Sequence, residues 1–246
     1  MRILLLDIET SPNTAFVWGL FNENIPLARL IDSSEVLCWS AKWYGEKEMF
    51  FDSIYQSSRR RLLKRIHSLL NVADAVVTYN GNRFDIPVLN KEFFMEGMLP
   101  PAPYKKIDLY QTIRRQFRFV SNKLDHVADQ LGLGKKKETD FKLWVDCMNK
   151  DKAAWAKMED YNRHDVILLE KLYVHSLPWI VNHPNHGLYN NGKIACPTCG
   201  KNHIQRRGVS KAKSLTYIRY QCQDCGSWFK SAKAIETDKK PKLGKI

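Results

Sequence analysis

The sequence has no hydrophobic run long enough to span a membrane. The apolar stretch at residues 3–6 ends at Asp7, which makes it too short for the core of a signal peptide. Internal repeats are also absent, and 44% hydrophobic with 26% charged residues does not match disordered, collagen-like or coiled-coil proteins. We therefore expect a soluble, cytoplasmic globular protein that does not associate with membranes.

Negative charge is scarce in one part of the chain. The sequence has 39 Lys and Arg against 26 Asp and Glu, a formal net charge of +13. Residues 183–246 carry +10 of this charge, and residues 1–182 carry only +3. Such an excess is typical of proteins that contact polyanions. We therefore expect the C-terminal quarter to contact nucleic acid.

The secondary structure alternates between strands and helices up to residue 182. Apolar and β-branched residues predict strands, and 3.6-residue periodicity predicts helices. The expected strands cover residues 3–6, 16–20, 36–44, 48–51, 75–79 and 107–110, and the expected helices cover about 59–72, 88–96, 121–132 and 152–175. This order favours an α/β fold, a mixed β-sheet flanked by helices.

Turn-forming residues then mark a change in organisation. His, Pro, Asn and Gly dominate residues 183–193, which we interpret as a linker. The predicted domains are therefore residues 1–182 and a small domain at 194–238. Residues 239–246 form a Lys-rich basic tail that we expect to be disordered.

Two carboxylates end the first predicted strand. Asp7 and Glu9 are two residues apart, so both side chains point to the same side of the strand. Like charges at this separation repel each other unless a cation lies between them. Taken alone, the pair is also compatible with strand-end acids that accept hydrogen bonds from loop amides.

Two further segments add acids and a tyrosine. Asp85 follows a turn that contains Asn80 and precedes a predicted helix, where it could also act as an ordinary N-cap. Tyr161 and Asp165 are four residues apart on the long predicted helix and therefore share one face. Their alternative interpretation is a core aromatic residue and a surface acid.

Together these segments resemble the RNase H-like 3′→5′ exonucleases of the DnaQ-like superfamily, in the subclass with three Asp, one Glu and a catalytic Tyr (DEDDy). Proofreading domains of family B DNA polymerases belong to that subclass. The resemblance is carried by Asp7-Ile8-Glu9-Thr10, Asn80-Gly81, Phe84-Asp85-Ile86-Pro87, and Tyr161 with Asp165. The related His subclass has a histidine five residues before the last Asp, where this chain has Asp160. His164 is interpreted as a surface or substrate-side residue.

The resemblance implies a two-metal-ion mechanism with Mg²⁺ or Mn²⁺. In this assignment Asp7 bridges both ions, Glu9 and Asp165 complete the site that activates water, and Asp85 holds the second ion. Tyr161 orients the attacking water, because an ordinary phenol is a poor base at neutral pH. The terminal nucleotide is expected to contact Asn80 and Phe84.

The six cysteines fall into two groups. Four form two Cys-x2-Cys pairs, Cys196 with Cys199 and Cys222 with Cys225. This spacing predicts one structural Zn²⁺ in a zinc ribbon, with redox chemistry as the alternative. The segment also resembles zinc ribbons of transposase-associated proteins that bind DNA. The other two, Cys38 and Cys147, are expected to be buried apolar groups.

Basic and aromatic residues alternate in this predicted ribbon. The proposed contacts to nucleic acid are Arg206, Arg207, Arg219, Tyr220 and Trp228, with support from Lys211, Lys213, Tyr217 and Lys230. Arginines contact phosphates and aromatic rings stack on bases, as in single-strand binders. A basic module that docks a protein is the alternative, and His203 is expected to lie on the surface.

The combined hypothesis is a divalent-metal-dependent 3′→5′ exonuclease that acts on single strands or 3′ ends, with DNA favoured over RNA. An RNA exonuclease is the first alternative, because no motif reports on a 2′-hydroxyl. An inactive nucleic-acid-binding or adaptor protein is the second, although all four acids and the tyrosine are present. Any proofreading role would require a separate polymerase or another replication or repair protein as partner.

Overall fold

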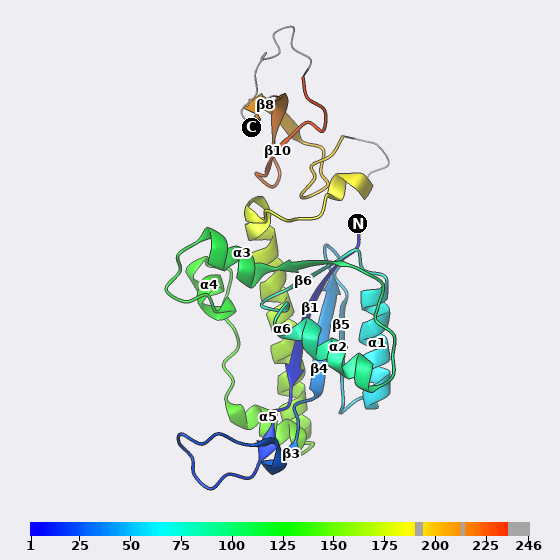
Figure 1. The fold of residues 1–246 in the computed structure, drawn as a ribbon, viewed down its shortest axis with the longest axis vertical. Coiled ribbons are helices and arrows are strands. Elements are labelled where there is room, and N and C mark those ends of the chain that lie inside the picture. The colour runs from blue at the N-terminus through cyan, green and yellow to red at the C-terminus, as the bar shows by residue number, and fades with distance from the viewer. Residues whose placement is uncertain (190–193, 213–214, 236–246) are drawn as a thin grey trace. The chain divides into compact units, whose positions relative to one another are not determined.

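The computed structural model describes residues 1–189, 194–212 and 215–235 (Figure 1). They divide into two compact units, Arg2–Leu172 and the residues from Tyr173 onward, and each unit is described by itself. Residues 190–193 of the expected linker and the expected basic tail at 239–246 lie outside the described residues. No described helix is long and apolar enough to cross a membrane.

The larger unit contains a five-stranded sheet in the order β5-β4-β1-β6-β7. Its strands are β1 (Ile3–Thr10), β4 (Val36–Trp43), β5 (Met49–Ser53), β6 (Ala75–Thr78) and β7 (Lys105–Asp108). Strand β4 pairs antiparallel with β1 and β5, while β1, β6 and β7 run parallel. The mixed α/β fold predicted from the sequence is therefore confirmed.

Helices cover both faces of this sheet (Figure 1). They are α1 (Arg59–Asn71), α2 (Asp85–Met95), α3 (Leu109–Gln116), α4 (Leu124–Gln130), α5 (Phe141–Met148) and α6 (Lys152–Ser176). Leu4, Leu6 and Ile8 of β1 share a core cluster with α1 and α2. Because side chains alternate along a strand, Asp7 and Glu9 point to the opposite face, where α6 lies.

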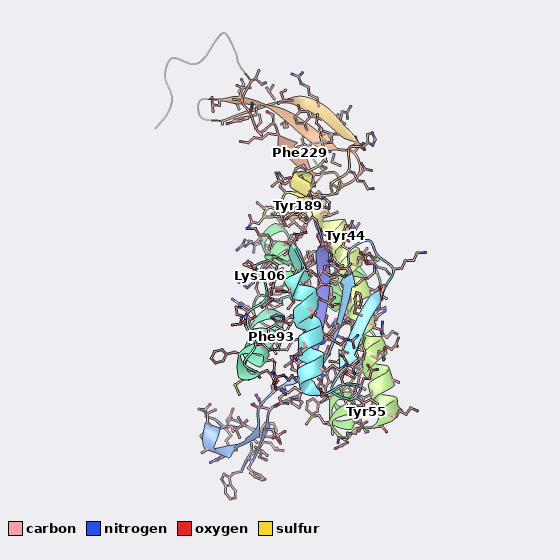
Figure 2. All side chains as sticks on the ribbon, turned by 90° about the vertical axis from the view of Figure 1, so that its right-hand side faces the viewer. Tyr44, Tyr55, Phe93, Lys106, Tyr189 and Phe229 are labelled. Carbon is pink, nitrogen blue, oxygen red and sulfur yellow. The ribbon has the colours of Figure 1, made fainter. Side chains whose placement is uncertain are left out.

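A second core cluster packs β4 and β5 against α5 and α6. Cys38 and Cys147 are both buried in it, as the sequence predicted for the two unpaired cysteines. Trp155 of α6 donates a 2.9 Å hydrogen bond from its indole nitrogen to the carbonyl of Cys147. Its ring stacks on Tyr55, labelled in Figure 2, with 5.7 Å between ring centroids. These contacts fix α6, which carries two of the expected site residues.

The strand predicted over residues 16–20 is wrong. The chain forms only the short strands β2 (Thr14–Ala15) and β3 (Leu30–Asp32) here, and a 3₁₀ helix at Leu27–Arg29. Phe16 and Trp18 are 73% and 90% exposed. Aromatic residues favour strands only where they pack on neighbours, and this loop extends from the end of β1 away from the sheet (Figure 1).

The strand predicted over 107–110 is shorter at its C-terminal end than expected. Asp108 ends β7 because its carboxylate caps α3, accepting a 3.0 Å hydrogen bond from the backbone N–H of Tyr110. The predicted helix at 121–132 begins only at Leu124 as α4. Helices α3 and α5 were not predicted from the sequence, because each has only eight residues.

The second unit contains a small antiparallel sheet in the order β10-β9-β8. Its strands are β8 (Ile204–Lys211), β9 (Thr216–Cys222) and β10 (Trp228–Lys230), preceded by 3₁₀ helices at Leu177–Trp179 and His186–Tyr189. The expected linker begins at His183, whose ring stacks on Tyr173 and shares a 2.7 Å hydrogen bond with its hydroxyl. The described start of this segment is therefore packed against the end of α6.

Candidate functional site

Three carboxylates converge at the end of β1. Asp7, Glu9 and Asp165 each offer an oxygen, and these oxygens all lie within 4.8 Å of one another. The two β1 acids are together because they are two residues apart on one strand. Asp165 reaches them from α6, where it is 1% exposed. The chain thus brings together acids that are more than 150 residues apart in the sequence.

Asp85 lies next to this trio at the first residue of α2. It is 3% exposed, and its Oδ1 accepts a 3.2 Å hydrogen bond from the backbone N–H of Ile8, between Asp7 and Glu9. The helix N-cap is Phe84, so Asp85 is not the N-cap that the sequence left as an alternative. This bond fixes the fourth acid to the strand that carries two of the others.

Tyr161 and Asp165 share one face of α6, as their spacing predicted. The Tyr161 side chain hydrogen-bonds to the Asp165 carboxylate, and the ring is 8% exposed. Burial raises the pKa of the tyrosine above its usual value, so its hydroxyl remains protonated at neutral pH. The side chain can therefore position a hydrogen-bond partner but is a poor source of negative charge.

Lys136 is a further member of the site that the sequence analysis missed. Its ammonium group forms a salt bridge with Asp165 and lies 3.3 Å from the Tyr161 hydroxyl. Burial alone would lower its pKa, but the negative charge of Asp165 produces a net upward shift, so the lysine is charged. The sequence gives no sign of this role, because Lys136 lies between Lys135 and Lys137, and three consecutive lysines are typical of a solvated surface.

Two other missed residues hold the β1 carboxylates in place. Asn162 of α6 is fully buried and donates a 2.7 Å hydrogen bond to the Asp7 carboxylate. The Trp144 side chain hydrogen-bonds to Glu9 from α5. Its ring also packs edge-on against Tyr161, with 6.0 Å between centroids. The acids are therefore oriented by the helices packed on their face of the sheet.

The carboxylates raise one another's pKa values. Burial raises the pKa of Asp7, and the negative charges of Asp165, Asp85 and Glu9 raise it further. Burial, followed by the charge of Asp165, raises the pKa of Glu9 to about 8. Burial also raises the pKa of Asp85 to about 7. A site of this kind disfavours its own negative charge and gains from a cation.

The donor set fits divalent cations. All the converging ligand atoms are carboxylate oxygens, the donors that suit Mg²⁺ and Mn²⁺. The buried Oδ1 of Asp165 has no hydrogen-bond partner among the described residues. A bound cation would satisfy that oxygen and offset the repulsion among the acids.

The turn before Asp85 is fixed by a tight backbone approach. Asn80 has a positive φ of 66°, and a Cβ added at Gly81 would lie 2.2 Å from the Thr78 Oγ1. Only glycine fits at position 81 without displacing Thr78. Phe84 follows this turn and is 42% exposed. The two residues predicted to contact the terminal nucleotide, Asn80 and Phe84, are thus beside Asp85 in one rigid turn.

The remaining polar residues near the site have other partners. Asp160, at the position of the histidine in the related subclass, forms a salt bridge with Lys137 and is exposed. His164 shares a 2.7 Å hydrogen bond with the carbonyl of Lys135. Neither side chain belongs to the group of three converging carboxylates.

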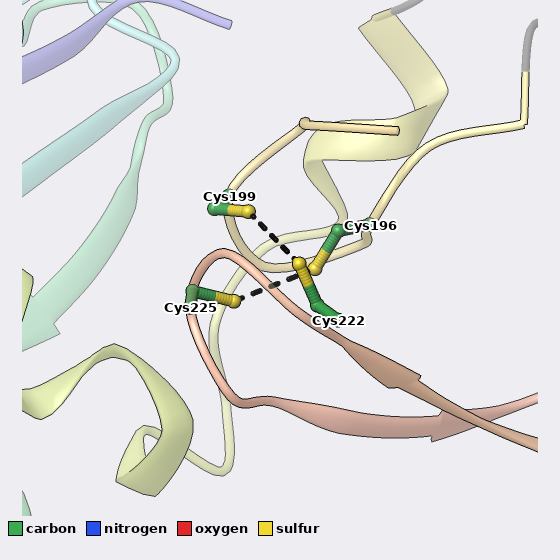
Figure 3. Close-up of side chains that lie close together, drawn as sticks. All are labelled: Cys196, Cys199, Cys222 and Cys225. Atoms are coloured by element: carbon green, nitrogen blue, oxygen red, sulfur yellow. Dashed lines mark hydrogen bonds between the residues drawn. The ribbon is translucent and has the colours of Figure 1, made fainter. Parts of the chain in front are cut away.

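Four cysteines form a second cluster, in the smaller unit. Figure 3 shows Cys196 and Cys199 from one loop meeting Cys222 and Cys225 from another. Two of the Sγ–Sγ distances are 3.7 Å (Cys196 to Cys225) and 3.6 Å (Cys199 to Cys222). Sulfurs at roughly 2.3 Å from a tetrahedral zinc ion would lie about 3.8 Å apart. The cluster could therefore hold zinc.

Backbone and side-chain donors surround these sulfurs. The backbone N–H of Thr198 donates to the Cys196 sulfur at 3.4 Å, and the backbone of Lys201 bonds to Cys199. The backbone of Ser227 bonds to Cys225, whose thiol donates to the Ser227 hydroxyl at 3.3 Å. Burial raises the pKa of the Cys196 and Cys199 thiols, whereas the pKa of Cys225 is lowered although burial opposes the shift. Hydrogen-bond donors of this kind stabilise thiolates, the form that binds metal.

The residues predicted to bind nucleic acid in this unit lie on two faces of its sheet. Register pairing places Arg219 and Trp228 on one face, with 5.0 Å from the guanidinium carbon to the indole centroid. Tyr220 is on the other face, paired with Arg206 and stacked on Phe229 (Figure 2). Arg207 lies at an irregularity in β8, where its carbonyl accepts a 3.0 Å hydrogen bond from Arg219. The five residues therefore do not form one continuous surface, and His203 is exposed as expected.

One solved structure with a similar fold is a family B DNA polymerase from the hyperthermophilic archaeon Pyrobaculum calidifontis. The TM-score is 0.52 with 17% sequence identity, and the match covers 87% of this chain. It covers 31% of the polymerase chain, so this protein corresponds to about a third of that chain's length. A search of curated protein sequences finds no match.

A family model provides the stronger comparison. The model of the RNase_H superfamily matches residues 4–177, which is more than half of the chain. The matched range contains Asp7, Glu9, Asp85, Tyr161 and Asp165. Nucleases with this fold use divalent metals, which agrees with the carboxylate cluster described above. The chain belongs to the RNase_H superfamily, and its fold supports a nuclease-type function.

Proposed function

We propose that this protein is a 3′→5′ exonuclease that hydrolyses phosphodiester bonds with two divalent metal ions. The observation that carries the proposal is the convergence of Asp7, Glu9 and Asp165 within 4.8 Å. Asp85 adjoins them through its bond to Ile8, and Tyr161 through its bond to Asp165. This set contains every residue type of the DEDDy pattern in one site.

The acids divide between two ions in this proposal. Asp7 interacts with all three other acids, because the charges of Asp165, Asp85 and Glu9 each raise its pKa, so Asp7 would be the shared ligand. When bound, two such ions neutralise charge on the phosphate, activate water and stabilise the leaving 3′-oxygen. Asn162 and Trp144 hold Asp7 and Glu9 in their orientations. Mg²⁺ and Mn²⁺ are the expected ions, because all the ligands are hard oxygens.

Tyr161 orients the attacking water. Its hydroxyl is bonded to Asp165 and accepts a hydrogen bond from Lys136, which leaves one oxygen lone pair to accept a hydrogen bond from water. Because burial raises the pKa of this phenol, it holds the water in position and does not remove its proton. Lys136 contributes positive charge beside the same hydroxyl, 3.3 Å away. That charge favours a negatively charged phosphate in the site.

The terminal nucleotide is assigned to the turn before Asp85. Asn80 offers a side-chain amide for hydrogen bonds, and the partly exposed ring of Phe84 offers a packing surface. Both are held beside Asp85, because the backbone N–H of Phe84 bonds to the carbonyl of Asn80 at 3.1 Å. A 3′ end on this turn would place its last phosphodiester bond near the four acids.

The cysteine cluster is proposed to bind one structural Zn²⁺ and so form a zinc ribbon. In this proposal residues 1–182 are the nuclease domain, and residues 194–238 are a basic module that increases the affinity for nucleic acid. The face with Arg219 and Trp228 suits a single strand, since it combines a phosphate contact with a stacking ring. A second face carries Arg206 and Tyr220.

DNA is the favoured substrate, and a polymerase or another replication or repair protein is the proposed partner. The fold is shared with a DNA polymerase of which the match covers 31%. The proposed partner would supply synthesis, while this chain would remove nucleotides from 3′ ends. RNA remains the alternative substrate, because a 2′-hydroxyl can be accepted or rejected by small changes in the pocket.

A digestion assay tests the function. Single- and double-stranded DNA and RNA are labelled at the 5′ end and incubated with the full chain in Mg²⁺, Mn²⁺ or EDTA. We expect 5′-labelled single-stranded DNA to shorten progressively with either metal and to remain intact in EDTA. A parallel sample with a 3′ label should release labelled mononucleotides first. Release of the 5′ label first, or cleavage at internal positions, would contradict the proposed polarity.

A further inference from the structure

A basic groove begins at the turn that contains Asn80. Two adjoining hollows of about 360 and 420 Å³ share Arg114 and Arg115 of α3 as lining residues. The first hollow also reaches Asn80 and Arg83, and the second extends along the segment that follows α3, past Arg118 to Asn122. We call this surface the α3 arginine groove. It lies entirely within the larger unit.

The groove concentrates positive charge without acids. Its lining includes Arg83, Arg114, Arg115 and Arg118 but neither Asp nor Glu. None of these four guanidinium groups forms a salt bridge with any residue that the structure describes. Arg59 and Arg163 of the same unit, in contrast, pair with glutamates. Four arginines without acids repel one another, so a bound polyanion would be stabilised here.

The groove is rigidly connected to the carboxylate site. Asp108 accepts hydrogen bonds from the backbone N–H groups of Asn80 (2.9 Å) and Asn82 (3.2 Å), and it also caps α3. One buried carboxylate therefore holds the Asn80 turn against the start of α3. Leu109 and Ile113 anchor α3 in the core, which leaves Arg114 and Arg115 exposed. The distance from the groove to Asp85 is consequently fixed by the fold.

Aromatic rings line both hollows. Tyr110 lines the first and packs edge-on against Tyr79, with 5.9 Å between centroids. Phe117 and Phe119 line the second and form another edge-on pair at 5.9 Å. Guanidinium groups beside aromatic rings are the combination with which proteins bind unpaired nucleotides, through phosphate contacts and base stacking. Duplex backbone binding would need the charges but not the rings.

We propose that the α3 arginine groove binds the single-stranded nucleotides that precede the terminal nucleotide of the substrate. Its assignment as the path to the carboxylates rests on the proposed exonuclease function. Binding of a single strand in the groove does not. The groove begins at Asn80, so a strand whose last nucleotide lies on the Asn80–Phe84 turn continues directly onto Arg83 and α3. This gives the larger unit its own nucleic-acid surface, independent of the basic C-terminal quarter.

A binding measurement in EDTA tests the groove without degradation. The full chain carrying Arg114→Gln and Arg115→Gln is compared with the full chain carrying Arg60→Gln and Arg61→Gln. The control pair is also exposed and adjacent in sequence, but it lies on α1, which begins soon after β5, the opposite edge strand of the sheet. Fluorescence anisotropy with a labelled single strand of about 12 nucleotides should show at least about tenfold weaker binding for the groove variant only. The slope of log K for binding against log salt concentration should also be shallower by about 1.4 in the groove variant, because two phosphate contacts of about 0.7 each are lost.

Two outcomes would overturn the proposal that the groove binds a single strand. Equal affinities and salt slopes for the two variants, or no binding by the unmodified chain, exclude it as a single-strand site. Degradation assays in Mg²⁺ separate this result from the function itself. If the unmodified chain degrades single strands and both variants bind and degrade them equally well, the groove proposal is wrong and the exonuclease proposal is retained. If nothing is degraded but binding depends on Arg114 and Arg115, the exonuclease fails and the groove stands.

Discussion

The protein has two clusters of metal-ligand side chains, and they sit in very different surroundings. The carboxylates of Asp7, Glu9 and Asp165 lie in a unit whose sheet is covered by helices on both faces and buried in two large core clusters. In the described part of 194–235, the only buried residues are Cys196, Cys222 and Ser227. A hydrophobic core holds the carboxylates in place. The cysteine cluster instead makes up most of the buried part of its small unit.

This difference indicates opposite roles for the metals proposed to bind the two clusters. Carboxylates that are raised in pKa by burial and repulsion gain from a cation, but the surrounding core does not depend on it. A small sheet with so few buried residues would gain most of its stability from a bound metal. Loss of the first metal should therefore remove chemistry, and loss of the second should remove structure.

The largest expected effect is on turnover. Asp7→Asn removes the charge shared by both proposed ions but keeps the shape of the side chain. Turnover should fall by about a thousandfold or more, since several kcal/mol of transition-state stabilisation are lost. The melting temperature should be the same or slightly higher, because one of the repelling charges is gone. Timed digestion and thermal melts on the same preparation measure both quantities, and a folded variant with normal turnover would contradict the site.

The next effect separates the two clusters directly. Cys222→Ser removes one of four thiolates and should unfold the small sheet, since the metal stands in for a core there. Backbone NMR should show signals of residues 194–235 collapsing to unfolded positions, while the signals of 3–172 remain. Zinc content measured by elemental analysis should fall with them. Cys38→Ser, a buried thiol outside both clusters, is the control that should retain zinc.

Tyr161→Phe should have a milder effect within the carboxylate site. It removes one orienting hydroxyl while the four acids remain, so turnover should fall about tenfold to a hundredfold, as for one hydrogen bond to a charged group. The affinity for a single strand in EDTA should not change. Steady-state kinetics with Mg²⁺ measure the loss, and unchanged turnover would make Tyr161 a purely structural core residue.

The smallest expected effect is the pH dependence of stability. The folded pKa of Glu9 is raised to about 8 and that of Asp85 to about 7, so the folded chain binds more protons than the unfolded chain from about pH 4.5 upward. Metal-free protein should therefore lose stability as pH rises through this window. Added Mg²⁺ should raise the melting temperature more at pH 8.5 than at pH 6.

Glu9→Gln is the matched variant for this measurement. It removes one titrating group, so the metal-free variant should lose less stability between pH 6 and 8.5 than the unmodified chain. Equal pH profiles of stability for the two proteins would show that the pKa of the Glu9 carboxyl is not raised in the metal-free fold.

Much of the fold followed from local sequence patterns. The helical periodicity of the 25-residue α6 extends over several turns, and the continuous apolar run at the start of β1 is typical of a buried strand. The segment at 16–20 was misassigned because aromatic residues favour strands only where a neighbouring strand exists, and here none pairs with it in the described fold. Helices α3 and α5 span only about two turns each, too few for a reliable periodic signal.

The candidate site divides in the same way. Asp7 with Glu9 and Tyr161 with Asp165 were predictable because each pair lies on one local element with fixed spacing. Lys136 comes from a loop between helices, and only tertiary packing brings it to Asp165. The α3 arginine groove was hidden for a related reason. Residues 1–182 average to a net charge of only +3, and the fold separates the four arginines from the acids that balance them.

The most direct test compares two aspartates of α6 in the full chain. Asp165→Asn alters a buried acid of the converging trio, and Asp160→Asn alters an exposed acid less than two turns away that pairs with Lys137. Both variants lose one negative charge from the same helix. With 5′-labelled single-stranded DNA and Mg²⁺, we expect Asp165→Asn to lose nearly all degradation and Asp160→Asn to degrade the strand normally. Equal degradation by the two variants would contradict a metal-dependent nuclease site at this cluster.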